Sequence, residues 1–122
     1  MNVRLIVPNH HGRCDRNCKV FPCPEPIATY GKAIADIAGG FTATQGIGGW
    51  IGPGAPGEPN KLVVEPVTVF DCFIDDSCYL PGPLGKAEDF RNLAKQIASD
   101  LHQDCVYLSI DGKVEYVRSD KA

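Results

Sequence analysis

Residues 87–118, AEDFRNLAKQIASDLHQDCVYLSIDGKVEYVR, have the pattern of a helix, a strand, a tight turn and a second strand. In the first half, six apolar residues recur at helical spacing and form one stripe: Phe90, Leu93, Ala94, Ile97, Ala98 and Leu101. In the second half, Asp111-Gly112 is typical of the two-residue turn of a β-hairpin. The segment therefore predicts a helix that packs its apolar stripe on an antiparallel sheet.

The preceding part of the chain has the same kinds of pattern. A second apolar stripe, Ile27, Tyr30, Ile34 and Ile37, predicts a helix that starts near Pro26 and ends at Gly39-Gly40. Runs of β-branched and aliphatic residues predict strands over 2–7, 41–46 and 61–75. The order of elements is β, α, β, β, α, β, β.

This order predicts an α+β ferredoxin-like sandwich, βαββαβ(β), with two helices packed on one face of an antiparallel sheet. Residues 113–118 would be an added or extending strand. A chain of 122 residues fits a single domain, 1–122. Within it we expect a Cys-rich loop at 9–24 and a Gly/Pro-rich hairpin loop at 46–60, where six glycines occur.

The strand expected over 61–75 is apolar on both faces and contains Pro66. Proline cannot donate to a ladder, so Pro66 predicts an edge or a bulge in this strand. Because a monomer would leave one apolar face uncovered, we expect a homo-oligomer.

Charge and hydropathy exclude several classes of partner. The 12 basic and 15 acidic residues give a net charge of −3, without the basic patch that nucleic acid requires. No apolar run has the length of a membrane span or of a secretory signal. We therefore expect a cytoplasmic protein, of the host cell if the chain is phage-encoded.

The loop HHGRCDRNCKVFPCP, residues 10–24, concentrates histidine and cysteine. Its thiolates and imidazoles could hold a zinc ion in tetrahedral coordination, although the C-x2-C spacing of common zinc sites is absent. A disulfide and ordinary free thiols are the alternatives. The candidate zinc ligands are Cys14, Cys18, Cys23 and His11, with His10 as a substitute for His11. Cys72 and Cys105 lie in expected strands, and we expect both in the core.

Four residues outside that loop are candidates for binding a small molecule. Trp50 lies in a glycine-rich segment without a P-loop pattern; it either stacks on a ligand or packs on the sheet or a neighbouring subunit. Glu65 is a carboxylate in an apolar strand, where it is a general acid or base or simply faces an edge. Gln103 ends the second helix, where it caps the helix or binds a ligand. Gly49 precedes Trp50.

Three stretches carry a resemblance to known proteins: GGFTATQGIGGW, VVEPVTVFDCFI and LHQDCVYLSIDGKVEYV. They resemble small uncharacterised bacterial and phage proteins that share a Gly-Gly-aromatic-Thr, Gly-Trp, Glu and Gln-x-x-Val pattern. The resemblance covers roughly residues 25–118, leaves the cysteine loop outside, and implies a ferredoxin-like domain without an assigned reaction. The matching positions are Gly39, Gly40, Thr42, Gly49, Trp50, Glu65 and Gln103.

Our interpretation is a non-enzymatic binding protein that holds a nucleotide-like small molecule at an oligomer interface, where Trp50 meets a neighbouring subunit. Small phage proteins that sequester nucleotide signals are an analogy for this function. The alternative is a structural domain stabilised by zinc through Cys14, Cys18 and Cys23. An enzyme that uses Glu65 or a thiol is the third hypothesis.

Overall fold

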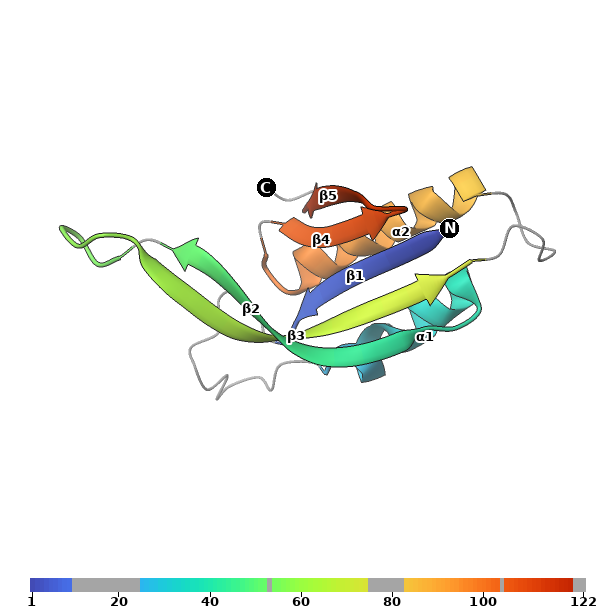
Figure 1. Cartoon of the computed structure of the whole chain (residues 1–122), viewed down its shortest axis with the longest axis horizontal. Helices are drawn as coiled ribbons and strands as arrows, with labels where there is room; N and C mark the ends of the chain where they lie inside the picture. Colours follow the sequence, from blue (N-terminus) through green and yellow to red (C-terminus); the bar gives the residue numbers. More distant parts are fainter. Residues whose placement is uncertain (10–24, 53, 75–82, 104, 120–122) are drawn as a thin grey trace.

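The computed structural model describes residues 1–9, 25–52, 54–74, 83–103 and 105–119. Its elements follow the predicted order and are shown in Figure 1. They are β1 (Asn2–Pro8), α1 (Pro26–Ala38), β2 (Thr42–Gly52), β3 (Lys61–Phe73), α2 (Pro83–Asp100), β4 (Cys105–Ile110) and β5 (Lys113–Arg118). Among these residues, no helix is long and apolar enough to cross a membrane.

The strands form one five-stranded sheet in the order β2-β3-β1-β4-β5, and all neighbours pair antiparallel. Both helices lie behind the sheet in Figure 1, so that one face is covered and the other is open. Side chains on the covered face form the core. Its largest fully buried members include Phe70, Phe90, Leu5, Ile34, Ile97, Leu101 and Leu108.

This sheet contradicts the predicted ferredoxin-like sandwich. The structure is an α+β fold whose five-stranded sheet departs from the four strands of a standard ferredoxin-like βαββαβ domain. The reason lies in the turn between β4 and β5, where Asp111 and Gly112 have φ values of 50° and 83°. Two left-handed residues match the twist of the flanking strands. Lys113–Arg118 therefore pairs with all of β4 and completes the sheet as a full edge strand.

Both helices confirm their predictions and end as the sequence indicates. The carboxylate of Glu25 caps α1 by accepting hydrogen bonds from the backbone N–H groups of Ile27 and Ala28. Gly39 ends the helix with a φ of 86°, and its N–H donates to the Ala35 carbonyl. The apolar stripe of α2 is buried along its length, as expected: Phe90, Leu93, Ala94, Ile97, Ala98 and Leu101.

The strands β2 and β3 are longer than the rest of the sheet. The last pair between β1 and β3 is Pro8–Val67, but β2 and β3 stay paired as far as Gly52–Lys61. Residues 47–52 and 61–66 therefore form a two-stranded arm, which projects to the left in Figure 1. The hairpin loop predicted at 46–60 is thus strand as far as Gly52, because a ladder joins backbone groups and needs no side chains.

Pro66 lies where β3 loses its second neighbour, and the predicted edge is confirmed. Its carbonyl accepts a hydrogen bond from the N–H of Asn9, the residue that follows β1. Both backbone groups of a strand residue point to the same side, so the proline nitrogen also faces the side on which the ladder ends. A missing N–H costs nothing at this position.

Candidate functional site

Trp50 and Glu65 lie on the same face of the arm. Gly48 pairs with Glu65 and Trp50 pairs with Val63, so the two side chains are diagonal neighbours across the β2–β3 ladder. This face continues the open face of the sheet, because the alternate β3 residues Phe70 and Cys72 point into the core. Trp50 is 50% exposed and Glu65 is partly buried. The structure therefore places an aromatic ring and a carboxylate on one face of the arm.

Three glycines of β2 share this face with Thr44 and Trp50: Gly46, Gly48 and Gly52. A Cβ at Gly52 would lie 3.1 Å from Cζ3 of Trp50, so the indole ring lies over this glycine. A Cβ at Gly48 would lie 3.1 Å from Cγ1 of Val67, which closes over that glycine in the same way. Because the glycines have no side chains, Trp50 and Val67 pack close to the strand.

Gly49 lies on the opposite face of the arm and is not brought together with Trp50 and Glu65, because successive strand residues point to opposite sides. This opposite face continues the helix-covered side of the sheet, but the arm extends past the helices in Figure 1. It exposes four large apolar side chains, which we call the apolar face of the arm: Ile47 (79%), Ile51 (65%), Leu62 (64%) and Val64 (57%).

Gln103 lies in the connection between α2 and β4. Its N–H donates to the Ala98 carbonyl at 2.9 Å, and His102 before it has a φ of 53°, which together form a Schellman-type end to α2. Gln103 precedes β4 at the end of the sheet from which the arm leaves, since Ile6 near the end of β1 pairs with Tyr107 near the start of β4. No sheet pairing joins Gln103 to Glu65.

A polar cluster built around the buried Thr68 lies where the arm joins the sheet, and sequence reasoning missed it. Thr68 is fully buried, and its hydroxyl donates to Oδ1 of Asn9 at 2.7 Å and accepts from Nε2 of Gln45 at 3.2 Å. Nδ2 of Asn9 donates to Oε1 of Gln45 at 3.0 Å. We call these three residues the root cluster. The alternation of β3 could have indicated that Thr68 is buried, because alternate strand residues point to the same face and Phe70 and Cys72 lie on that face as well.

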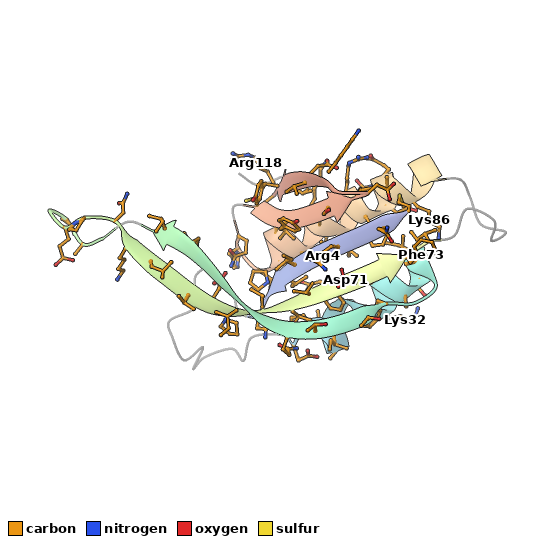
Figure 2. The ribbon with its side chains drawn as sticks, in the orientation of Figure 1. Arg4, Lys32, Asp71, Phe73, Lys86 and Arg118 are labelled. Carbon is orange, nitrogen blue, oxygen red and sulfur yellow. The ribbon has the colours of Figure 1, made fainter. Side chains whose placement is uncertain are left out.

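A shallow hollow of about 510 Å³ lies on the open face, at the end of the sheet away from the arm. Arg4 and Asp71 form an ion pair inside it, with Nε of Arg4 2.8 Å from Oδ1 of Asp71, and Figure 2 shows the two side chains together. The hydrogen bond and the charge of Asp71 raise the pKa of Arg4. Because the two charges compensate each other, the hollow presents no net charge to a ligand, and we do not place the site there.

The zinc ligands proposed from the sequence, Cys14, Cys18, Cys23 and His11, lie outside the described residues. Within residues 1–9, 25–52, 54–74, 83–103 and 105–119, no group of three or more His, Cys, Asp or Glu side chains could hold a metal. Cys72 is a buried free thiol, as predicted. The prediction that Cys105 lies in the core is wrong: it is half-buried, because its neighbour Val106 takes the inward position of β4.

No protein-family model matches the chain, and no curated protein matches its sequence. Solved structures do share its fold. A phage SAM lyase in complex with S-methyl-5'-thioadenosine superposes with a TM-score of 0.67 at 13% identity, over 99% of this chain and 91% of that one. A phage SAM lyase in the apo state gives a TM-score of 0.59 at 16% identity, over 98% and 89%. These neighbours are phage proteins, which agrees with the phage-type resemblance; the shared sequence pattern stays a prediction.

Proposed function

We propose that the protein binds an adenosine thioether, S-adenosylmethionine (SAM) or S-methyl-5'-thioadenosine, on the face of the arm that carries Trp50 and Glu65. One observation carries the proposal: an aromatic ring and a carboxylate share one face of the arm. The likeness in fold to a phage SAM lyase that holds S-methyl-5'-thioadenosine supports this choice of ligand.

The chemistry of the two side chains suits the two halves of SAM. A purine ring stacked on a tryptophan gains about 1–3 kcal/mol, and Trp50 is half exposed and so offers a surface for stacking. The sulfonium of SAM is a cation, which the carboxylate of Glu65 attracts. S-Methyl-5'-thioadenosine has no such charge, so Glu65 should matter more for SAM than for the neutral thioether.

A second copy of the chain supports the arm in this proposal. A two-stranded ribbon is marginally stable by itself, and the apolar face of the arm exposes four large side chains to water. Packing this face on a neighbouring subunit removes that surface and steadies the arm, while the opposite face, with Trp50 and Glu65, stays open to a ligand. Gln103, at the end of the sheet beside the arm, then supplies an amide for directional hydrogen bonds to the ribose or the base.

The experiment is calorimetric titration of the purified protein with each ligand. Trp50→Ala should weaken the binding of both ligands by about tenfold or more, the loss expected for one stacked base. Phe73→Ala is the matched control, since Phe73 is an aromatic on the open face with 67% exposure, away from the arm. Glu65→Gln should weaken the binding of SAM more than the binding of the thioether. Glu58→Gln, at the tip of the arm, is its control. Undetectable binding to the wild type at millimolar ligand would refute the proposal.

Cleavage of SAM is a second candidate, favoured by the enzymatic activity that the structural neighbours are named for. S-Methyl-5'-thioadenosine forms when the bond between the sulfonium sulfur and the amino-acid chain of SAM breaks and the electron pair stays on sulfur. The carbon fragment then loses a proton to a base or closes on its own carboxylate. Chromatography of SAM incubated with the protein separates the two functions: new thioether that disappears in Glu65→Gln indicates a lyase, and intact SAM indicates a binding protein.

A further inference from the structure

The root cluster ties three strands together on the line where the arm leaves the sheet. Asn9 follows β1, Gln45 belongs to β2 and Thr68 to β3, and their side chains close a ring of hydrogen bonds of 2.7, 3.0 and 3.2 Å. The backbone N–H of Asn9 also donates to the Pro66 carbonyl at 3.1 Å, next to Glu65. Of the strands that the structure describes, β2 and β3 alone continue beyond this line.

A two-stranded ribbon has no fixed direction of its own. Two-stranded ribbons twist more than broad sheets, and nothing but their attachment sets the angle at which they leave a sheet. The arm lacks both β1 and the helices as supports, so this angle depends on the residues at its root.

The hydrogen bonds of the root cluster can hold the arm at one angle to the sheet. Thr68 is fully buried, at a position where valine would fill the same space without a polar atom. A buried hydroxyl is tolerated only when its hydrogen bonds are made, and these bonds are directional, unlike apolar contacts. A change in the angle of the arm moves Gln45 and Asn9 relative to Thr68 and breaks the ring, at a cost of about 1–3 kcal/mol for the group left unsatisfied.

We propose that Asn9, Gln45 and Thr68 are positioning residues that hold the arm at one angle to the sheet and thereby place Trp50 and Glu65 relative to Gln103. The fixed angle of the arm is a property of the ligand-free protein. Its effect on ligand affinity rests on the proposed function, and the two are measured separately.

The fluorescence of Trp50 reports the motion of the arm directly, because Trp50 is the only tryptophan of the chain. Thr68→Val removes the hydroxyl and keeps the shape, and we expect the time-resolved anisotropy of Trp50 to gain a fast component that the wild type lacks. Thr68→Ser restores a hydroxyl and should restore the slow decay. Thr44→Val is the matched control, since Thr44 is an exposed β2 threonine outside the cluster. Each variant is compared at the same oligomeric state.

The binding measurement follows on the same variants. Thr68→Val should weaken the binding of S-methyl-5'-thioadenosine about tenfold, equal to about 1.4 kcal/mol. The affinities of Thr68→Ser and Thr44→Val should stay near that of the wild type. Gln45→Leu, at an exposed position, repeats the test if Thr68→Val does not fold. An unchanged Trp50 decay in Thr68→Val or Gln45→Leu, or a loss that Thr68→Ser does not rescue, overturns the proposal. If Thr68→Val mobilises Trp50 but the wild type binds no thioether, the positioning role of the root cluster is supported and the proposed function is rejected.

Discussion

At the scale of single residues, Asp111 combines two roles in the β4–β5 turn. Its φ of 50° lies in the left-handed region, which aspartate and asparagine tolerate better than other residues with a side chain. Its Oδ1 also accepts a hydrogen bond of 2.8 Å from the N–H of Asn2, the first residue of β1. We expect Asp111→Ala to lower the free energy of unfolding by about 1–2 kcal/mol, because it loses both effects.

Urea unfolding measures this loss. Asp111→Asn is the matched control: it keeps the acceptor oxygen and the left-handed tolerance, so its unfolding midpoint should stay near that of the wild type. Equal midpoints for Asp111→Ala and wild type would contradict the assignment.

Cys72 predicts how stability depends on alkaline pH. Burial, with a smaller contribution from the charge of Asp71, raises the pKa of this thiol from 9.0 to about 11. Between these values the unfolded chain loses the proton and the folded chain keeps it, so the unfolded state binds fewer protons. Stability therefore falls as pH rises from about 9 to about 11.

Chemical unfolding at a series of pH values measures this slope. Cys72→Val has no thiol at this position, and its stability should fall less steeply over the same range. Parallel slopes for the two proteins would show that Cys72 is not the titrating group.

At the scale of elements, polar contacts link the two helices inside an apolar interface, and in one of them the ammonium of Lys86 in α2 donates to the Ile37 carbonyl in α1. Tyr30 of α1 is buried, and its hydroxyl donates to Oδ2 of Asp100 at the end of α2, at 3.1 Å. Burial, followed by the charge of Asp100 and this hydrogen bond, raises the pKa of Tyr30. We expect Tyr30→Phe to lower the free energy of unfolding by about 0.5–1.5 kcal/mol.

A thermal melt followed by circular dichroism measures the change, and Asp100→Asn, which keeps an acceptor, should be milder. If Tyr30→Phe melts at the wild-type temperature, water replaces the lost hydrogen bond at no cost.

The two helices could be predicted because their apolar spacing is strong and their ends carry local signals, Pro26 and Gly39 for α1. The length of β2 could not, because six glycines and several prolines between residues 46 and 60 have the composition of a loop, whereas the ladder depends on backbone groups alone. Trp50 and Glu65 were singled out from their chemistry, but their shared face required the register. The root cluster joins residues up to 59 positions apart, so the alternation of β3 could indicate that Thr68 is buried but not which side chains it contacts.

At the scale of the whole molecule, the apolar face of the arm is the feature that a monomer leaves unexplained. In our proposal a second copy covers it, so a charge there should separate the subunits. We expect Ile51→Glu to lower the mass measured by light scattering to that of one chain, because an unpaired carboxylate buried at an interface is costly.

Val114→Glu is the control, since Val114 is an exposed apolar residue of β5, on the open face, with 48% exposure. A wild type that already has the mass of one chain would contradict an oligomer built on the arm. A mass that changes equally in both variants would place the interface on the sheet instead.

The fold class could be predicted only in part at this scale. The order of elements, the α+β class and the Asp111-Gly112 turn before an added strand follow from the sequence, but the arrangement of all five strands in one sheet required the observed pairing. The proposed ligand class rests on the likeness in fold to phage SAM lyases together with the shared face of Trp50 and Glu65, whereas the sequence alone predicted a nucleotide-like small molecule without naming it.

The place of β1 in the sheet has a consequence for synthesis and folding. The β2–β3 hairpin and the unit formed by α2, β4 and β5 are each continuous in sequence, but β1 lies between them and pairs with β3 and β4. Because β1 is synthesised before both of its partners, it waits for β4 until about one hundred further residues have followed, with the pair Leu5–Leu108 as an example. Insertion of β1 between two units that are already formed should then be the late and rate-limiting step, since contacts of such long separation form slowly.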